Sequence, residues 1–379
     1  MARLRVASPS RSQVSMGSSN RSSSLETGAL PACDLFNTTF SLYRASALYV
    51  GADGLSDVRL RSLEVRLRDI LTGDFVRGIE VGLDEDGDHA LGKAGALEAV
   101  AIEWVSAEQV VAASMPALQV TLQYEHAQCL AILLPAPEAS RPTNGATSTL
   151  DNGFLRLPLL LLRMPAPFKD VITSFLSSSF DCRISALQLN DKDVIHGWES
   201  WARATMLPTS GSLAKDAILT LAFSLPGLDG AEGTAEDDDV TSPASPIFPG
   251  PPPGPLEAVD AASSSMSDTA GIGLKTIDIF IPNGDLRGFL EAGLRLQPMD
   301  EEGSTPFTSA LALYVKTHLG LDMAHPAVSV VRVACGGFVL SNNRLKVFEP
   351  PGSRSGIYLG RHGGIVPLIL GDLALRAGG

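Results

Sequence analysis

Alternation of apolar and polar residues constrains the fold more than any other feature of this sequence, because it recurs in many short segments. From Leu118 to Tyr124, every second residue is apolar and the residues between are polar. Successive strand side chains point to opposite faces, so this spacing predicts a strand with one buried face. The same alternation occurs at 219–225 and 277–281. Further predicted strands are 35–43, 75–83, 97–105, 128–134, 155–164, 182–189, 328–334, 338–341 and 344–348.

Five other segments place apolar residues three and four positions apart, as one side of a helix requires. Asp57, Pro167, Asp191 and Asp285 stand at the start of four of them, and Pro306 opens the fifth. The segments are 60–71, 168–176, 194–201, 286–294 and 307–315. Strands come in consecutive runs and the helices are inserted singly. The sequence therefore predicts an α+β fold, with largely antiparallel, curved sheet and about five helices packed on it.

Two segments interrupt this pattern by their composition. Residues 1–30 are rich in Ser and Arg and poor in large apolar side chains, so we expect a disordered basic tail. Residues 227–272 hold nine acids and no Lys or Arg, with the run PGPPPGP at 249–255. Like charges repel and proline removes hydrogen-bond donors, which predicts a disordered acidic linker. The predicted α+β parts are then 31–226 and 273–379.

Charge and cysteine content narrow the class of protein. The 379 residues carry a net charge of −13, so the overall balance does not favour non-specific binding to nucleic acid. The four cysteines are far apart and form no CxxC pair, as in a reduced cytosolic or nuclear protein. The most apolar run, 155–164, contains Arg156, Pro158 and Arg163. It is too short and too polar to span a membrane, and we expect no membrane partner.

No catalytic, metal or cofactor site is predicted. Cys335, followed by two glycines, resembles part of the caspase cysteine motif, but the His-Gly pair at His196 lies too far upstream. The acidic run 84–88 lacks the glycine and glutamate that a calcium loop needs. His318 and His325 have no partner at ligand spacing. A thiol hydrolase that uses Cys335 is therefore the weakest of the functional hypotheses.

One basic surface feature is the polar side of the first predicted helix, which carries Arg59, Arg61, Arg66 and Arg68. Such a helix side can simply be solvated and partly paired, for example between Glu64 and Arg68. It can also contact an acidic partner, and a DNA-binding module that uses these arginines is the alternative function.

The order of the ordered segments resembles the fungal kinetochore subunits of the CENP-L family. The similar blocks are 36–49, 67–74, 91–97, 180–187, 274–282 and 310–340. The sequence departs from the family pattern at Ala45, Ala47 and Ala186. These changes affect local turns. The resemblance extends over about residues 35 to 350, apart from the linkers.

The resemblance implies a non-catalytic structural subunit of the inner kinetochore, in the nucleus at the centromere, without a cofactor. It implies pairing with a CENP-N-like partner, which contacts the centromeric nucleosome, and assembly with other inner-kinetochore subunits. Relatives join that partner largely through their C-terminal sheet, so we place the interface within 338–375, and a homodimer is the alternative assembly for the isolated chain. The residues expected at the interface are Phe338, Leu340, Val347, Phe348, Ile357, Tyr358 and Leu359. Packing of these side chains in the chain's own core is the alternative.

Overall fold

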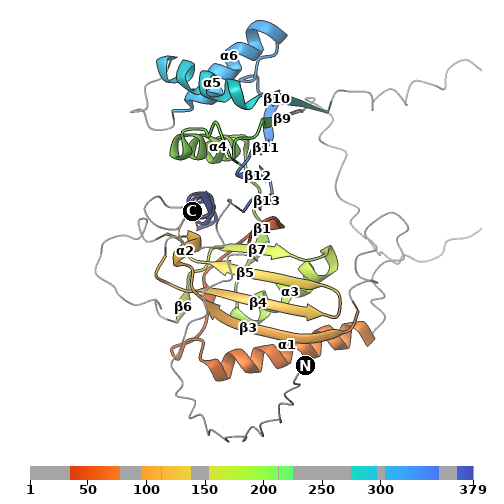
Figure 1. The fold of residues 1–379 in the computed structure, drawn as a ribbon. Helices are drawn as coiled ribbons and strands as arrows, with labels where there is room; N and C mark the ends of the chain where they lie inside the picture. The colour runs from red at the N-terminus through yellow and green to blue at the C-terminus, as the bar shows by residue number, and fades with distance from the viewer. Residues whose placement is uncertain are drawn as a thin grey trace, which may run out of the picture.

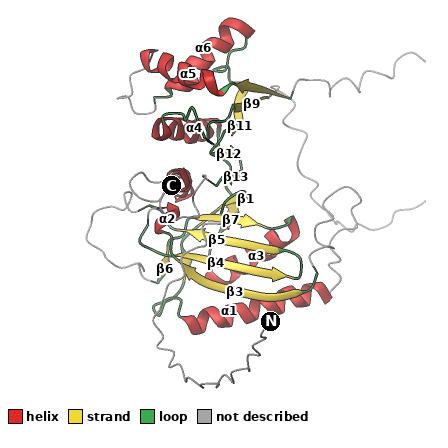
Figure 2. Ribbon diagram, viewed as in Figure 1, coloured by secondary structure: helices red, strands yellow, loops and turns green. Residues whose placement is uncertain are grey.

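The computed structural model describes residues 35–76, 95–137, 153–224, 275–296, 304–349 and 365–378, except positions 112 and 212. Figure 1 gives the path of the chain, and Figure 2 the arrangement of helices and strands. The strands are β1 (Thr39–Ala45), β2 (Leu48–Tyr49), β3 (Leu97–Val105), β4 (Ala117–Tyr124), β5 (Gln128–Leu134), β6 (Phe154–Leu155), β7 (Leu159–Arg163), β8 (Ile184–Ala186), β9 (Ala217–Phe223), β10 (Thr276–Ile281), β11 (Val328–Ala334), β12 (Phe338–Ser341) and β13 (Arg344–Val347). The helices are α1 (Asp57–Val76), α2 (Glu108–Val111), α3 (Ala166–Phe180), α4 (Asp191–Thr205), α5 (Asn283–Leu296), α6 (Pro306–Leu319) and α7 (Ile365–Gly378).

One large sheet organises the described residues. Its strands follow the order β10-β9-β11-β12-β13-β1-β7-β5-β4-β3, and β8 pairs with β1 beside this path. All the strand pairs in it are antiparallel. The strands of the upper half in Figure 1 are turned relative to those of the lower half, as strand twist requires. The predicted α+β class with a largely antiparallel, curved sheet is confirmed.

In the lower half of the sheet, strands β4, β5 and β7 are buried on both faces, whereas the outermost strand β3 exposes Glu98, Ala99 and Glu103. In β5 all residues from Cys129 to Leu134 are buried. Alternate side chains of these strands therefore enter two different cores. One core contains the apolar side of α1 and of α3, and the other contains residues of α2 and α7. Helices on both faces account for the nearly continuous apolar runs of β5 and β7, which a half-exposed strand does not need.

The upper half, from β9 to β13, has helices on one face. Figure 1 shows α4, α5 and α6 on the same side of these strands. The core between them contains a group of aromatic rings: Trp198 and Trp201 of α4 lie 5.3 Å apart between ring centroids, and Phe307 and Phe338 meet them edge-on at 4.9 and 6.0 Å. Such rings bury large areas and fix the helices by their geometry. The three helices are therefore anchored to this face of the upper strands by aromatic packing.

Helix α6 is held against α4 and α5 by contacts at its start. Its N-cap residue, Thr305, makes no capping hydrogen bond with its side chain. Instead the backbone N–H of Thr308 donates to Glu199 Oε1 of α4 at 2.8 Å. A Cβ at Gly293 of α5 would lie 1.8 Å from the carbonyl oxygen of Pro306, so only glycine permits this approach of α5 to α6. The two helices and α4 thus form one packed unit.

Several predicted boundaries are corrected by the structure. Helix α1 continues to Val76, past the end of the segment predicted at 60–71. The cap of α4 is Asn190 and not Asp191: Asn190 accepts from the N–H of Asp193, whose carboxylate accepts from the N–H of Asn190. Helices α2 and α7 were not predicted. Both helices pack into the core, and this packing stabilises them. The sequence of α2 is too short, and that of α7 too weakly periodic, to predict a helix.

The sheet is continuous across the two predicted α+β parts, because β9 of the first pairs with β10 and β11 of the second. Most of the strand predicted at 75–83 lies outside the described residues, and positions 75 and 76 belong to α1. The predicted tail 1–30 and linker 227–272 also lie outside them. Within the described part of the chain, no helix is both long and apolar enough to cross a membrane.

Candidate partner interface

The described cysteine side chains, Cys129, Cys182 and Cys335, are buried. Cys335 directly follows β11, and burial raises the pKa of its thiol to about 12. A nucleophilic cysteine needs the opposite, a lowered pKa and access to solvent. His, Cys, Asp and Glu side chains of the described residues nowhere gather in a group that could hold a metal ion. This surrounding gives the Cys335 thiol no means of activation.

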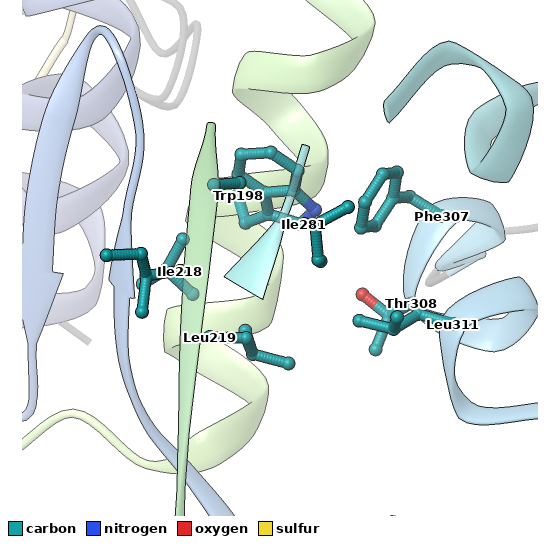
Figure 3. Close-up of a pocket in the computed structure, with 9 residues that line it drawn as sticks. Trp198, Ile218, Leu219, Ile281, Phe307, Thr308 and Leu311 are labelled. Carbon is teal, nitrogen blue, oxygen red and sulfur yellow. The ribbon is translucent and has the colours of Figure 1, made fainter. Parts of the chain in front are cut away.

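The cavity shown in Figure 3 lies between the sheet and helices α4 and α6. Its volume is about 10 Å³, which is close to the minimum for one water molecule. It is lined by Trp198, Ala217, Ile218, Leu219, Ile281, Phe307, Thr308, Leu311 and Val333. The lining is almost wholly apolar, so this cavity is a packing defect of the core and too small for a substrate or cofactor.

Three of the residues expected at the partner interface lie in the chain's own core. Phe338, Leu340 and Val347 are at most 4% exposed. Strand β12, which carries the first two, is hydrogen-bonded to β11 on one side and to β13 on the other, so it has no free edge. These three side chains are therefore not available to a partner, because the upper core already uses them.

The remaining expected interface residues differ in position. Phe348 is half-buried, and the ammonium groups of Lys215 and Lys346 lie 5.7 and 5.5 Å from the centroid of its ring. Such cation–π contacts hold a ring at the surface without a hydrophobic pocket. Ile357, Tyr358 and Leu359 lie outside the described residues, and their place at an interface stays a prediction.

The arginines predicted as a basic surface mostly make contacts within the chain. Arg59 donates to the carbonyl oxygens of Val50 and Gly54. Arg66 lies over the ring of Phe175 at 6.0 Å. Arg68 donates to the carbonyl oxygen of Glu98. Arg61, Arg66 and Arg68 are exposed, and Arg61 alone of the four makes none of these contacts. These contacts favour a structural role for three of the four arginines over the DNA-binding alternative.

The contacts of α1 close one end of the sheet. Strand β3 pairs only with β4, and α1 lies along its other side, as Figure 1 shows. Glu64 Oε1 accepts from the N–H of Ile102 at 2.8 Å, and Arg68 donates to the Glu98 carbonyl at 3.2 Å. The indole N–H of Trp104 donates to the carbonyl of Leu55. The charged side chains of Glu64 and Arg68 are thus hydrogen-bonded to backbone groups of β3 that would otherwise be free to pair with another strand.

Strand β10 forms the opposite end of the sheet and pairs only with β9. The N–H of Phe223 donates to the carbonyl of Lys275, so residue 275 and every second residue after it point their backbone groups toward β9. Those of Thr276, Asp278 and Phe280 point outward. No described segment pairs with them. Among the described strands, β10 is therefore the open edge of the sheet. The Phe280 side chain on this strand is 68% exposed.

Sequence reasoning identified β10 as a strand but not as an edge. One signal was present: β10 follows directly after the long acidic segment 227–272. Long insertions are accommodated at the margin of a fold, because they cannot enter a packed core. The strands before and after such an insertion are therefore candidates for an edge position.

A protein-family model matches almost the whole chain. It is the model of the family "CENP-L: Centromere protein L", and the match extends over residues 34–377. No curated protein shows a significant match to the chain. The family match covers both halves of the sheet, including α7, which lies beyond the range of the sequence resemblance. The chain therefore belongs to the centromere protein L family, a family of structural kinetochore proteins at the centromere.

Proposed function

We propose that this chain is a non-catalytic subunit of the inner kinetochore that pairs with a CENP-N-like partner and so links centromeric chromatin to the kinetochore. Family membership supports the kinetochore role. In this proposal the partner contacts the centromeric nucleosome, and the present chain holds the partner and other inner-kinetochore subunits together. The single observation that carries the pairing is the open edge at β10.

An open edge suits pairing with a second chain because backbone groups supply the affinity. The outward N–H and C=O groups of Thr276, Asp278 and Phe280 form the row that an added strand needs. The exposed ring of Phe280 can be covered by the same partner. In the absence of the partner, the β10 edges of two copies of this chain can pair with each other, which gives the homodimer expected for the isolated chain.

The segment that contains Ile357, Tyr358 and Leu359 stays part of this proposal as a second contact region. The prediction made from the sequence is that charge reversal at Tyr358 and Leu359 abolishes co-purification of the partner without unfolding the protein. Retained co-purification would remove this segment from the interface and leave the β10 edge as the remaining candidate.

A proline substitution tests the role of the β10 backbone. Proline lacks the N–H donor and is tolerated on an edge strand where that N–H faces outward. Phe280→Pro removes the outward donor, and Phe280→Ala removes the same ring but keeps the donor. If an added strand pairs here, Phe280→Pro should lose the partner in co-purification from the native cells and Phe280→Ala should retain much of it.

Equal recovery of the partner with both variants would refute pairing through the β10 backbone. Circular dichroism and thermal unfolding of both variants provide the folding control. Live imaging of the tagged chain beside a centromere marker tests the kinetochore role separately. Persistent foci at centromeres are expected, and a diffuse signal through mitosis would contradict the role itself.

A further inference from the structure

The face of the sheet opposite α4, α5 and α6 is covered in one half and bare in the other. In the lower half, α1 and α3 pack on this face. In the upper half, no described helix lies on it, as the right-hand side of Figure 1 shows. We call this upper part the bare face. Its side chains come from alternate positions of the paired strands: Thr39, Ile218, Thr220, Ala222, Thr276, Asp278, Phe280, Arg332, Ala334, Val339, Ser341, Arg344 and Lys346.

Cations gather on the bare face and at its margin. Arg332 projects from β11, and Arg344 and Lys346 project from β13, on the other side of β12. Lys215, like Lys346, lies over the ring of Phe348. Lys169 of α3 donates to Ser41 at the border with the covered half. Within the described residues, none of these five side chains forms an ion pair.

The carboxylates near the bare face do not balance these cations. Asp278 accepts from the hydroxyl of Thr220 at 2.6 Å, on the β10 side of the face. Asp170 lies near Lys169, but burial and the neighbouring Arg344 outweigh it and lower the pKa of Lys169. Adjacent like charges repel one another, so this face has lower energy when a polyanion neutralises it. The surface therefore fits an acidic chain that also offers apolar atoms to Ile218 and Val339.

We propose that the occupant of the bare face is the chain's own acidic segment, residues 227–272. This segment carries nine acids and no Lys or Arg, which complements the five cations. Its apolar residues, Ile247 and Phe248 among them, match the uncharged part of the face. The proposal does not depend on the kinetochore partner, because both surfaces belong to this chain.

The attachment points of the segment favour this occupant over a free polyanion. The 50 residues 225–274 connect Ser224, at the end of β9, to Lys275, at the start of β10. Both strands belong to the bare face. The distance from β9 across β11 and β12 to β13 is about 15 Å, and a flexible chain of this length spans about 40 Å. A tethered segment acts at a millimolar effective concentration, which a dilute competitor does not reach.

Zero-length carbodiimide cross-linking of the full-length chain, read by mass spectrometry, tests the contact directly. Carboxylates of 227–272 should be joined to Lys169, Lys215 or Lys346 within one molecule. Lys192 of α4 and Lys316 of α6 are exposed on the helix-covered side and serve as internal controls. Lys275 adjoins the segment and is not counted. Cross-links spread equally over the control lysines, or confined to Lys275, would overturn the proposal.

Binding of a fluorescein-labelled polyglutamate peptide, followed by anisotropy at low salt, measures the energetic consequence. In one variant all nine acids of 227–272 are replaced by their amides, which preserves the length of the segment. Relief of the internal competition should strengthen binding of the probe at least about tenfold. Adding Arg332→Glu, Arg344→Glu and Lys346→Glu should abolish that gain. Adding Arg61→Glu on α1 instead is a control with a single charge reversal away from the bare face, and it should leave the gain intact.

Two outcomes of this measurement would overturn the proposal. Unchanged affinity after neutralisation of the segment would mean that it does not occupy the bare face. If the gain in affinity for the probe persists in the triple variant, the probe binds to cations other than Arg332, Arg344 and Lys346. Circular dichroism of the triple variant controls for unfolding, and the cross-linking experiment uses the unmodified protein, so its result does not depend on the folding of any variant.

Discussion

The two ends of the sheet differ in whether the outward backbone N–H and C=O groups of the last strand have hydrogen-bond partners. At β3, Glu64 and Arg68 of α1 bind the N–H of Ile102 and the carbonyl of Glu98. At β10, no described segment pairs with the outward groups of Asp278 and its neighbours. The closed end needs no second chain, because a helix of the same chain already satisfies it. The open end is therefore the edge to which the proposed partner strand can be added, and it is not a general property of this sheet.

Loosening α1 at the closed end should have the largest effect on the molecule. Leu67 is fully buried between α1 and the sheet. We expect Leu67→Ala to lower the free energy of unfolding by about 2–5 kcal/mol, because it leaves a cavity under the helix. A loosened α1 should also free the β3 edge and cause self-association, which would make the two ends alike. Chemical denaturation and light scattering measure the two effects.

The control for this variant is Val65→Ala on the same helix. Val65 is 62% exposed, so its truncation should change the free energy of unfolding by less than about 0.5 kcal/mol. Equal effects of the two substitutions would contradict the view that the buried side of α1 protects β3.

The second prediction concerns the open end, where Glu199 holds α6 beside β10. Glu199 is fully buried and accepts the N–H of Thr308 at 2.8 Å. Glu199→Ala leaves this buried donor without an acceptor, so we expect a loss of about 1–3 kcal/mol in the free energy of unfolding. Glu199→Gln keeps an acceptor oxygen and should lose less. A larger loss in the glutamine variant would contradict the capping role.

Glu199 also makes the stability of this end depend on pH. Burial raises the pKa of its carboxyl above the ordinary value, and the hydrogen bonds from Thr308 and the charge of Arg203 only partly oppose this. The unfolded chain therefore releases the proton at a lower pH than the folded protein does, and stability falls as pH rises between the two pKa values. Urea unfolding from about pH 4.5 upward should show wild type declining relative to Glu199→Gln. A difference in the free energy of unfolding that stays constant with pH would contradict the raised pKa of Glu199.

A smaller effect is expected from Glu64 at the closed end. Glu64→Ala removes the acceptor of the Ile102 N–H but leaves the apolar contacts of α1 in place. We expect a loss of about 1 kcal/mol and faster hydrogen exchange at Ile102. In Glu64→Gln the acceptor is retained, so exchange there should stay slow. Fast exchange at Ile102 in wild type would show that the edge is not closed by this contact.

The sequence predicts the bounds of a strand well where its apolar pattern and the neighbouring turn residues indicate the same ends. Strands β3, β5, β11 and β12 have the predicted bounds, because their apolar patterns and the turns beside them agree. The class and the antiparallel sheet follow from the order of these segments. Helix α7 was missed, because an apolar side chain on nearly every position gives no 3.6-residue period to detect.

The position of each strand in the sheet could not be predicted. The candidate interface depends on this position, because only an edge strand can pair with a second chain. Phe338 and Leu340 have the composition of an interface strand, yet β12 lies inside the sheet and both are buried. Ile277 and Ile279 have the ordinary alternation of a half-buried strand, yet β10 lies at the end. Pairing partners depend on contacts between residues far apart in the sequence, whereas periodicity reports only which face of a strand is buried. Edge and central strands therefore look alike in their apolar periodicity.

The smallest effect on stability, and the one most specific to the open end, is expected from Phe280→Lys. The ring is 68% exposed, so its replacement should change the free energy of unfolding by less than about 0.5 kcal/mol. A lysine on an edge strand opposes edge-to-edge pairing, because two copies then bring like charges together. Sedimentation of the isolated chain should shift from dimer toward monomer, whereas Val58→Lys on the exposed side of α1 should not shift it. If both lysines act alike, self-association reflects net charge alone. If only Phe280→Lys acts, the two ends of the sheet differ in solution as they do in the structure.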